Sequence, residues 1–127
     1  TNLPFFEASR QSLTAIRSGV FPLLHTGRRA NDGIAIHYSA ASHIADSLFT
    51  EGKLSSAWME SLADFNRAVE DCGLQYEYVA YEEIEQDELR KGNYRVLLMP
   101  HSRAVSQKEA EAIRQFVQDG GLLIADL

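Results

Sequence analysis

The chain has 127 residues, enough for one domain that buries about two-thirds of the surface its unfolded chain exposes. Its formal net charge is −6, with eighteen acidic against twelve basic residues and no basic stripe, which argues against nucleic acid and membrane surfaces as partners. The single cysteine, Cys72, excludes an internal disulfide and a cysteine zinc site, and it favours a reducing, cytoplasmic location.

The first predicted element is an amphipathic helix within residues 5–25. Its apolar residues recur every three or four positions, which is the spacing of one helix face: Leu13, Ile16, Val20 and Leu23. Gly19 and Pro22 weaken this helix toward its end. The polar stretch TGRRANDG (26–33) then connects the helix to a first strand, Ile34–Tyr38.

The first strand is followed by a turn of small residues at which a helix starts. The next long helix is predicted from about residue 55 to residue 72. Its apolar residues recur at intervals of four, three and four: Trp58, Leu62, Phe65 and Val69. Gly73 supplies the left-handed stop. A strand at 74–81, a short acidic helical turn at 82–92 and a nearly continuous apolar strand at 94–100 follow.

The last helix has the clearest start signal, because Ser106 and Glu109 fit a capping box. Its predicted apolar face consists of Ala110, Ile113, Phe116 and Val117. Gly120 and Gly121 end the helix, and the fourth strand, LLIADL (122–127), comes next.

Strands that alternate with helices predict an α/β fold with a parallel sheet and right-handed crossovers. We expect a three-layer, flavodoxin-like arrangement with strand order 2-1-3-4 and an extra N-terminal helix. Residues 1–32 are assigned to this helix and a connector from a preceding domain, and residues 33–127 to the α/β domain itself.

Ligands of such folds bind beyond the carboxyl ends of the strands. Ser39 and Ser42, in the turn YSAASH (38–43), could donate hydroxyls to a phosphate, and His101 and Arg103 follow the third strand. These four residues would form the site of a flavin- or phosphate-binding module. Against this hypothesis, the turn has neither the glycine that lets a backbone approach phosphate oxygens nor a basic residue. We therefore favour a turn that only reverses the chain and caps a helix, with no cofactor.

Catalytic and metal-binding alternatives have weaker support in the sequence. Cys72 lies at a helix end, at the wrong edge of the sheet for a nucleophile, and is interpreted as a small packed apolar group. His37 lies within a strand and is interpreted as a hydrogen-bonded sheet residue, while His43 and His101 lack the partners of a zinc site. Asp126 is a lone carboxylate at a strand end. No catalytic residue and no metal ligand is assigned.

Several stretches in succession carry a resemblance: IRSGVFPLLHTGRRANDG, IAIHYSAAS, EDCGLQYEYVAYEEI and YRVLLMPHSRAVSQKEAEAIRQFVQDGGLLIAD. Together they resemble the middle, trimerisation domain of glycoside hydrolase family 42 β-galactosidases. The resemblance implies a class I glutamine amidotransferase-like fold that has lost its nucleophile. It also implies further elements after Leu127, and catalysis by two glutamates on a barrel domain that this chain does not contain.

Two hypotheses of different classes result. The first is a non-catalytic assembly domain of a β-galactosidase-like glycoside hydrolase, whose partners are the catalytic barrel of the same parent chain and further copies of itself. The second is the flavodoxin-like small-molecule module described above. We expect self-association through one of two surfaces. The first is the edge of the fourth strand, 122–127, which is apolar and carries a single charge, that of Asp126. The second is the apolar face of the first helix, formed by Leu13, Ile16, Val20 and Leu23.

Overall fold

The computed structural model describes residues 4–27, 30–49 and 56–126. The chain divides into two compact units, Thr1–Ala30 and Asn31–Leu127. None of the helices in the described ranges is long and apolar enough to cross a lipid bilayer.

Within residues 4–27, the first unit contains two helices where the sequence predicted one. Helix α1 spans Pro4–Ser18 and α2 spans Val20–Thr26. They are separated at Gly19, whose φ of −123° and ψ of −76° are not helical. Pro22 is the third residue of α2, where the backbone N–H it lacks would have no partner within the helix, so it is tolerated at a helix start. The predicted apolar stripe is exposed along its length: Leu13, Ile16, Val20 and Leu23.

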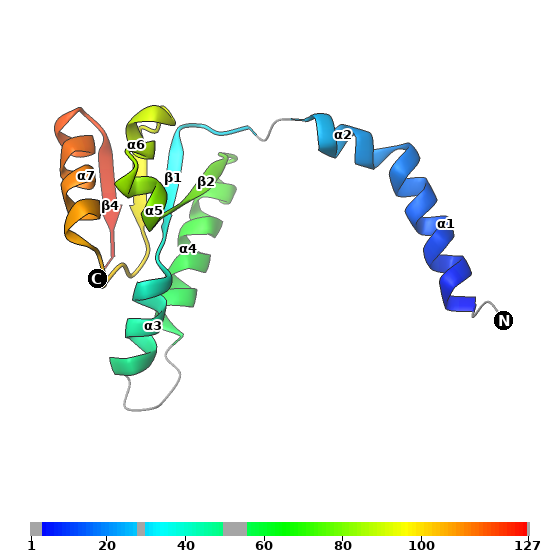
Figure 1. Cartoon of the computed structure of the whole chain (residues 1–127), viewed down its shortest axis with the longest axis horizontal. Coiled ribbons are helices and arrows are strands. Elements are labelled where there is room, and N and C mark those ends of the chain that lie inside the picture. The colour runs from blue at the N-terminus through cyan, green and yellow to red at the C-terminus, as the bar shows by residue number, and fades with distance from the viewer. Residues whose placement is uncertain (1–3, 28–29, 50–55, 127) are drawn as a thin grey trace. The chain divides into compact units, whose positions relative to one another are not determined.

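The second unit is built on a four-stranded parallel sheet in the order β2-β1-β3-β4, which confirms the predicted topology (Figure 1). The strands are β1 (Ile34–Tyr38), β2 (Tyr76–Ala80), β3 (Val96–Met99) and β4 (Leu122–Ala125). The bounds of β1 agree with the prediction, and those of β2 and β3 are shorter at each end. Strand β1 pairs with both β2 and β3, so the first strand of the sequence is central in the sheet.

Five helices connect these strands in the part of the chain that the structure describes. They are α3 (Ala40–Phe49), α4 (Ala57–Asp71), α5 (Tyr81–Glu85), α6 (Glu88–Lys91) and α7 (Gln107–Gln118). Helix α7 begins with the predicted capping box, in which the Ser106 hydroxyl accepts a hydrogen bond from the Glu109 N–H, and the Glu109 carboxylate accepts one from the Ser106 N–H.

Each face of the sheet has its own hydrophobic core, as expected for a three-layer fold. Alternate residues of a strand point to opposite faces, so Ile36 joins one core while Ala35 joins the other. Helix α4 supplies one core with Trp58, Leu62 and Val69. Helices α5, α6 and α7 supply the other core with Ile84, Leu89, Ile113 and Phe116. The helices therefore flank the sheet on both faces.

Two side-chain predictions are wrong. Cys72 is exposed and not packed in the core, because α4 ends at Asp71 and Cys72 is the residue that caps it. Val117 was assigned to the apolar face of α7 but is 43% exposed. The buried positions of this helix are Glu109, Ile113 and Phe116, spaced by four and three residues, and Val117 lies beside that face.

Candidate functional site

The carboxyl edge of the sheet joins the turn after β1 to the loop after β3. Ser39 and Ser42 are 2% and 0% exposed. The hydroxyl of each donates to the backbone oxygen of Ala104 over 3.3 Å. The Ser39 Oγ also accepts from the Ser42 N–H at 3.0 Å, and the Ser42 Oγ accepts from the Ala104 N–H at 3.0 Å. Both hydroxyls thus tie the turn to the loop, and their hydrogen atoms are already used.

A buried histidine, His37, connects β1 to the same loop and to α7. Its Nδ1 lies 2.9 Å from Ser102 Oγ and its Nε2 lies 3.1 Å from Glu109 Oε1. Burial lowers the pKa of His37 below its ordinary value, against the attraction of the Glu109 carboxylate, which raises it. A neutral imidazole has one donor and one acceptor, and a carboxylate only accepts. Nε2 therefore carries the proton, and Nδ1 is an acceptor that faces the Ser102 hydroxyl. His37 is hydrogen-bonded, as its position in the strand suggested.

The order serine, histidine, glutamate resembles the hydrogen-bond chain of a nucleophilic enzyme, but the geometry does not suit catalysis. A catalytic histidine must pass the proton of the nucleophile to a leaving group. The His37 side chain is fully buried, with partners at both ring nitrogens. The Ser102 hydroxyl also lies 3.2 Å from the Pro100 oxygen, to which it can donate instead. This chain of contacts anchors the loop between β3 and α7.

His101, the third candidate, occupies a strained position at the end of β3. Its φ of 40° lies in the left-handed region, which residues other than glycine rarely adopt. The His101 N–H donates to Asp126 Oδ1 at 2.6 Å, and the ring Nε2 lies 3.3 Å from Asp46 Oδ1. Ser61 Oγ donates to the second oxygen of Asp126 at 2.6 Å. These contacts hold the strained conformation in place.

Asp126 is consequently not the lone carboxylate that its place in the sequence suggested. Burial acts to raise the pKa of Asp126, but hydrogen bonds from the His101 N–H and the Ser61 hydroxyl outweigh this effect and lower it below the ordinary value. The group is therefore an ionised acceptor that joins α4, the end of β3 and the end of β4.

Of the four predicted ligand residues, Ser39 contributes to a cavity at this edge, and Ser42, His101 and Arg103 are not part of its lining. Arg103 is exposed, and its backbone N–H donates to the His101 oxygen. The cavity has a volume of about 380 Å³, and its lining consists of Ser39, Ala41, Tyr81, Glu85, Ala104, Val105, Ser106 and Glu109. This lining contains two carboxylates and no basic side chain, so it would repel a phosphate. Within residues 4–27, 30–49 and 56–126, no three histidine, cysteine or acidic side chains gather as metal ligands.

A flavin titration tests the site predicted for the alternative module. We expect no quenching of FMN fluorescence at micromolar protein, because the Ser39 and Ser42 hydroxyls are bound to Ala104 and the turn lacks glycine. The matched measurement is made with Ser42→Ala. A micromolar affinity that this substitution weakens would contradict the expectation and restore the small-molecule hypothesis.

Sequence reasoning missed Glu109 as a buried group, and it did not connect Asp46, Ser61 and Ser102 with the edge. A signal for Glu109 was present, because it precedes Ile113 and Phe116 by four and seven positions and so shares their helix face. Asp46 follows the buried Ser42 by four residues on α3, which also places the two on one face. No local pattern marks Ser61 or Ser102.

Neither a protein-family model nor a curated protein sequence matches the chain. Among solved structures, the chain is similar to a β-galactosidase from Bifidobacterium adolescentis, with a TM-score of 0.61 and 21% sequence identity. The match covers 76% of this chain and 41% of that one, so the chain spans less than half the length of the protein it matches. At this identity the similarity shows the fold.

Proposed function

We propose that the chain is a non-catalytic assembly domain of a β-galactosidase-like glycoside hydrolase. The observation that carries the proposal is the structural similarity to a β-galactosidase, which agrees with the independent resemblance of the sequence to the middle domain of family 42 enzymes. In this proposal the catalytic glutamates belong to a barrel domain of the same parent protein, and that domain is one partner of this chain.

The chemistry of the described residues supports a non-catalytic role. At the carboxyl edge, where α/β folds place their active sites, the polar groups have structural partners. Ser39 and Ser42 donate to the Ala104 backbone oxygen, His37 contacts Glu109, and Asp126 accepts from the His101 N–H. Cys72, the only thiol, is exposed at the end of α4 that leads into β2, at the opposite edge of the sheet. An activated thiol needs a base or a positive charge beside it, and among the described residues no hydrogen bond or ion pair joins the Cys72 side chain to one.

The enzymatic part of the proposal is tested on the purified chain. We expect no hydrolysis of a nitrophenyl β-galactoside and no release of ammonia from glutamine, because a glycosidase needs two carboxylates that flank the bond and an amidotransferase needs an activated thiol. Assays before and after a second purification step distinguish activity of the chain from activity of a contaminant. Turnover of constant specific activity through that step would contradict the proposal.

Self-association of this chain has a candidate surface in β4. Among the described strands, β4 is at the end of the sheet and pairs with β3 alone. Its side chains Leu122, Leu123 and Ile124 are 54%, 37% and 44% exposed. An apolar strand with an open row of backbone N–H and C=O groups is a template for pairing with another chain. We propose that copies of the chain associate through this strand.

Light scattering after size exclusion tests this surface. At about 10 μM protein we expect a mass above that of a single chain, because backbone pairing and apolar burial both favour association at an open edge. Ile124→Lys on β4 should shift the mass toward 14.2 kDa. Val117→Lys is the matched control, because Val117 is an equally exposed apolar residue on α7. A wild-type mass of 14.2 kDa, or an equal effect of both substitutions, would contradict the role of β4.

A further inference from the structure

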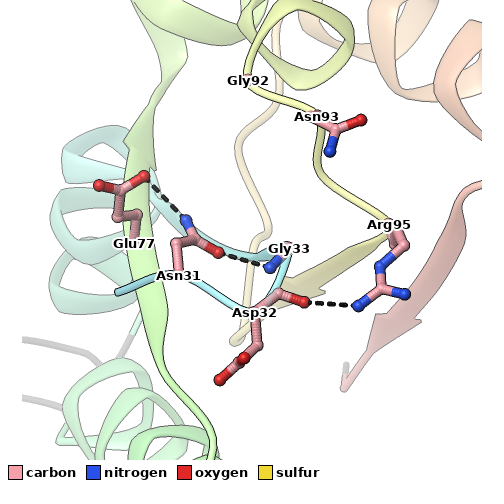
Figure 2. A pocket seen from close by; sticks show the side chains of 7 residues that line it. All are labelled: Asn31, Asp32, Gly33, Glu77, Gly92, Asn93 and Arg95. Atoms are coloured by element: carbon pink, nitrogen blue, oxygen red, sulfur yellow. Dashed lines mark hydrogen bonds between the residues drawn. The ribbon is translucent and has the colours of Figure 1, made fainter. Parts of the chain in front are cut away.

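A polar cavity of about 400 Å³ lies at the amino edge of the sheet, opposite the edge described above (Figure 2). Its walls come from the segment before β1, from β2 and from the segment before β3. The lining consists of Asn31, Asp32, Gly33, Glu77, Gly92, Asn93 and Arg95. The volume is within the range of small-molecule sites, and the lining is more polar than that of most such sites.

The first wall consists of Asn31 and Glu77, and both side chains are held in place. Asn31 Oδ1 accepts from the N–H groups of Gly33 and Ile34 at 2.6 and 3.1 Å, while its Nδ2 donates to Glu77 Oε2 at 2.8 Å. The Tyr94 hydroxyl donates to the same oxygen at 2.9 Å. Burial and this hydrogen bond raise the pKa of Tyr94 above its ordinary value, so the hydroxyl stays a donor. Glu77 Oε1 has no partner among the described residues.

The second wall faces the first and consists of Asn93 and Arg95 (Figure 2). One terminal nitrogen of Arg95 donates to the Asp32 backbone oxygen at 2.9 Å, which leaves the other N–H groups of the guanidinium available. The Asn93 amide has no hydrogen-bond partner among the described residues. Gly33 keeps the space between the walls open, because a Cβ at this position would lie 3.1 Å from Arg95 Nε, and its φ of 81° disfavours other residues.

We propose that this cavity binds a neutral, hydroxyl-rich ligand of the size of a single sugar residue. The carboxylate of Glu77 and the guanidinium of Arg95 lie on opposite walls, so their charges balance. The Asp32 carboxylate points away from the other lining side chains and accepts from the Gln75 N–H at 2.7 Å (Figure 2). Neighbouring hydroxyls of one ligand can donate to Glu77 and accept from Arg95, with the Asn93 amide able to do either.

The proposed site goes beyond the assembly role and does not depend on it, since the assembly surface lies on β4 and this cavity lies between the segments that lead into β1 and β3. The lining has no aromatic side chain on which a ring could stack. We therefore expect weak binding, with a dissociation constant on the order of 1 mM.

Saturation-transfer NMR on the full chain tests the proposal, because it detects weak binding and does not require the chain to be a monomer. The probes are D-galactose and D-glucose. Two comparison ligands test for charged binding: glycine, a zwitterion, and inorganic phosphate, an anion whose binding is followed by line broadening. We expect saturation of sugar protons, and a loss of about threefold or more in Asn93→Gly and in Arg95→Gln. Asn93→Gly keeps the positive φ of 57° at this position, so it tests the amide without straining the backbone.

Arg103→Gln is the control for a general loss of surface charge, since Arg103 is exposed outside the cavity. Sugar signals that persist in this variant and fall in the two cavity variants support the site. An absent sugar signal, a stronger response to glycine or phosphate, or an equal loss in Arg103→Gln would overturn it. None of these readouts reports turnover or assembly, so a failure here is separate from a failure of the proposed function.

Discussion

Replacing Glu109 with alanine should lower the free energy of unfolding by about 3 kcal/mol, the scale expected when one partner of a buried polar pair is removed. Glu109 is 3% exposed, and its two carboxylate oxygens lie 3.1 Å from His37 Nε2 and 2.6 Å from the Ser106 backbone nitrogen. Without the carboxylate, a buried imidazole N–H and the N–H at the start of α7 lose their acceptor together. Urea denaturation followed by circular dichroism measures the change.

Glu111→Ala is the matched control, because Glu111 is on the same helix two residues later and is exposed, with the Gln107 side chain as its hydrogen-bond donor. Its removal should change the free energy of unfolding by less than about 0.5 kcal/mol. Equal effects of the two substitutions would show that the buried contact with His37 contributes nothing beyond helix propensity.

The second large effect is a loss of stability in mild acid. The folded-state pKa of His37 is lowered, so the native state binds fewer protons than the unfolded state once the pH falls below the unfolded value of about 6.5. The contribution of His37 is therefore complete above that pH and is lost as the pH falls toward the folded pKa. The free energy of unfolding should decrease by up to about 1.4 kcal/mol per pH unit for this one proton.

Urea unfolding at a series of pH values from about 7.5 to 4.5 measures this slope. His37→Gln should flatten it, whatever its effect on stability at neutral pH, because the slope reports proton uptake. His43→Gln serves as the control, since His43 is exposed and stacks on Trp58. Identical slopes in wild type and His37→Gln would contradict the assignment. Asp126, with its lowered pKa, contributes in the same direction only at lower pH, below about 3.9.

The layers and strand order of the α/β unit were predictable because they depend on local patterns. The apolar run of β1 and the capping box of α7 are each readable within a few residues. The N-terminal helices show the limit of such patterns. Gly19 marked a weak point in the spacing, but only its backbone angles show that the helix divides there.

The contacts of the carboxyl edge were not predictable in the same way, because they join residues far apart in the sequence. Ser102 is 65 residues from His37, and Asp46 is 55 residues from His101. The topology predicted from the sequence was enough to place these groups at one edge of the sheet. Whether a serine faces a ligand or a backbone oxygen depends on how the loop after β3 packs on the turn after β1, and side-chain packing in three dimensions decides that.

The central position of β1 has a consequence for the newly made chain. Both strands that flank β1 come later in the sequence, and their residues pair with it across about 40 and about 60 positions. At translation rates of 5–20 residues per second, this apolar strand therefore waits about 2 to 8 seconds for β2 and about 3 to 12 seconds for β3. During that interval its backbone is open to capture by another nascent chain. Binding of a chaperone to the segment around Ile34–Tyr38 would benefit this protein most before β3 has left the ribosome.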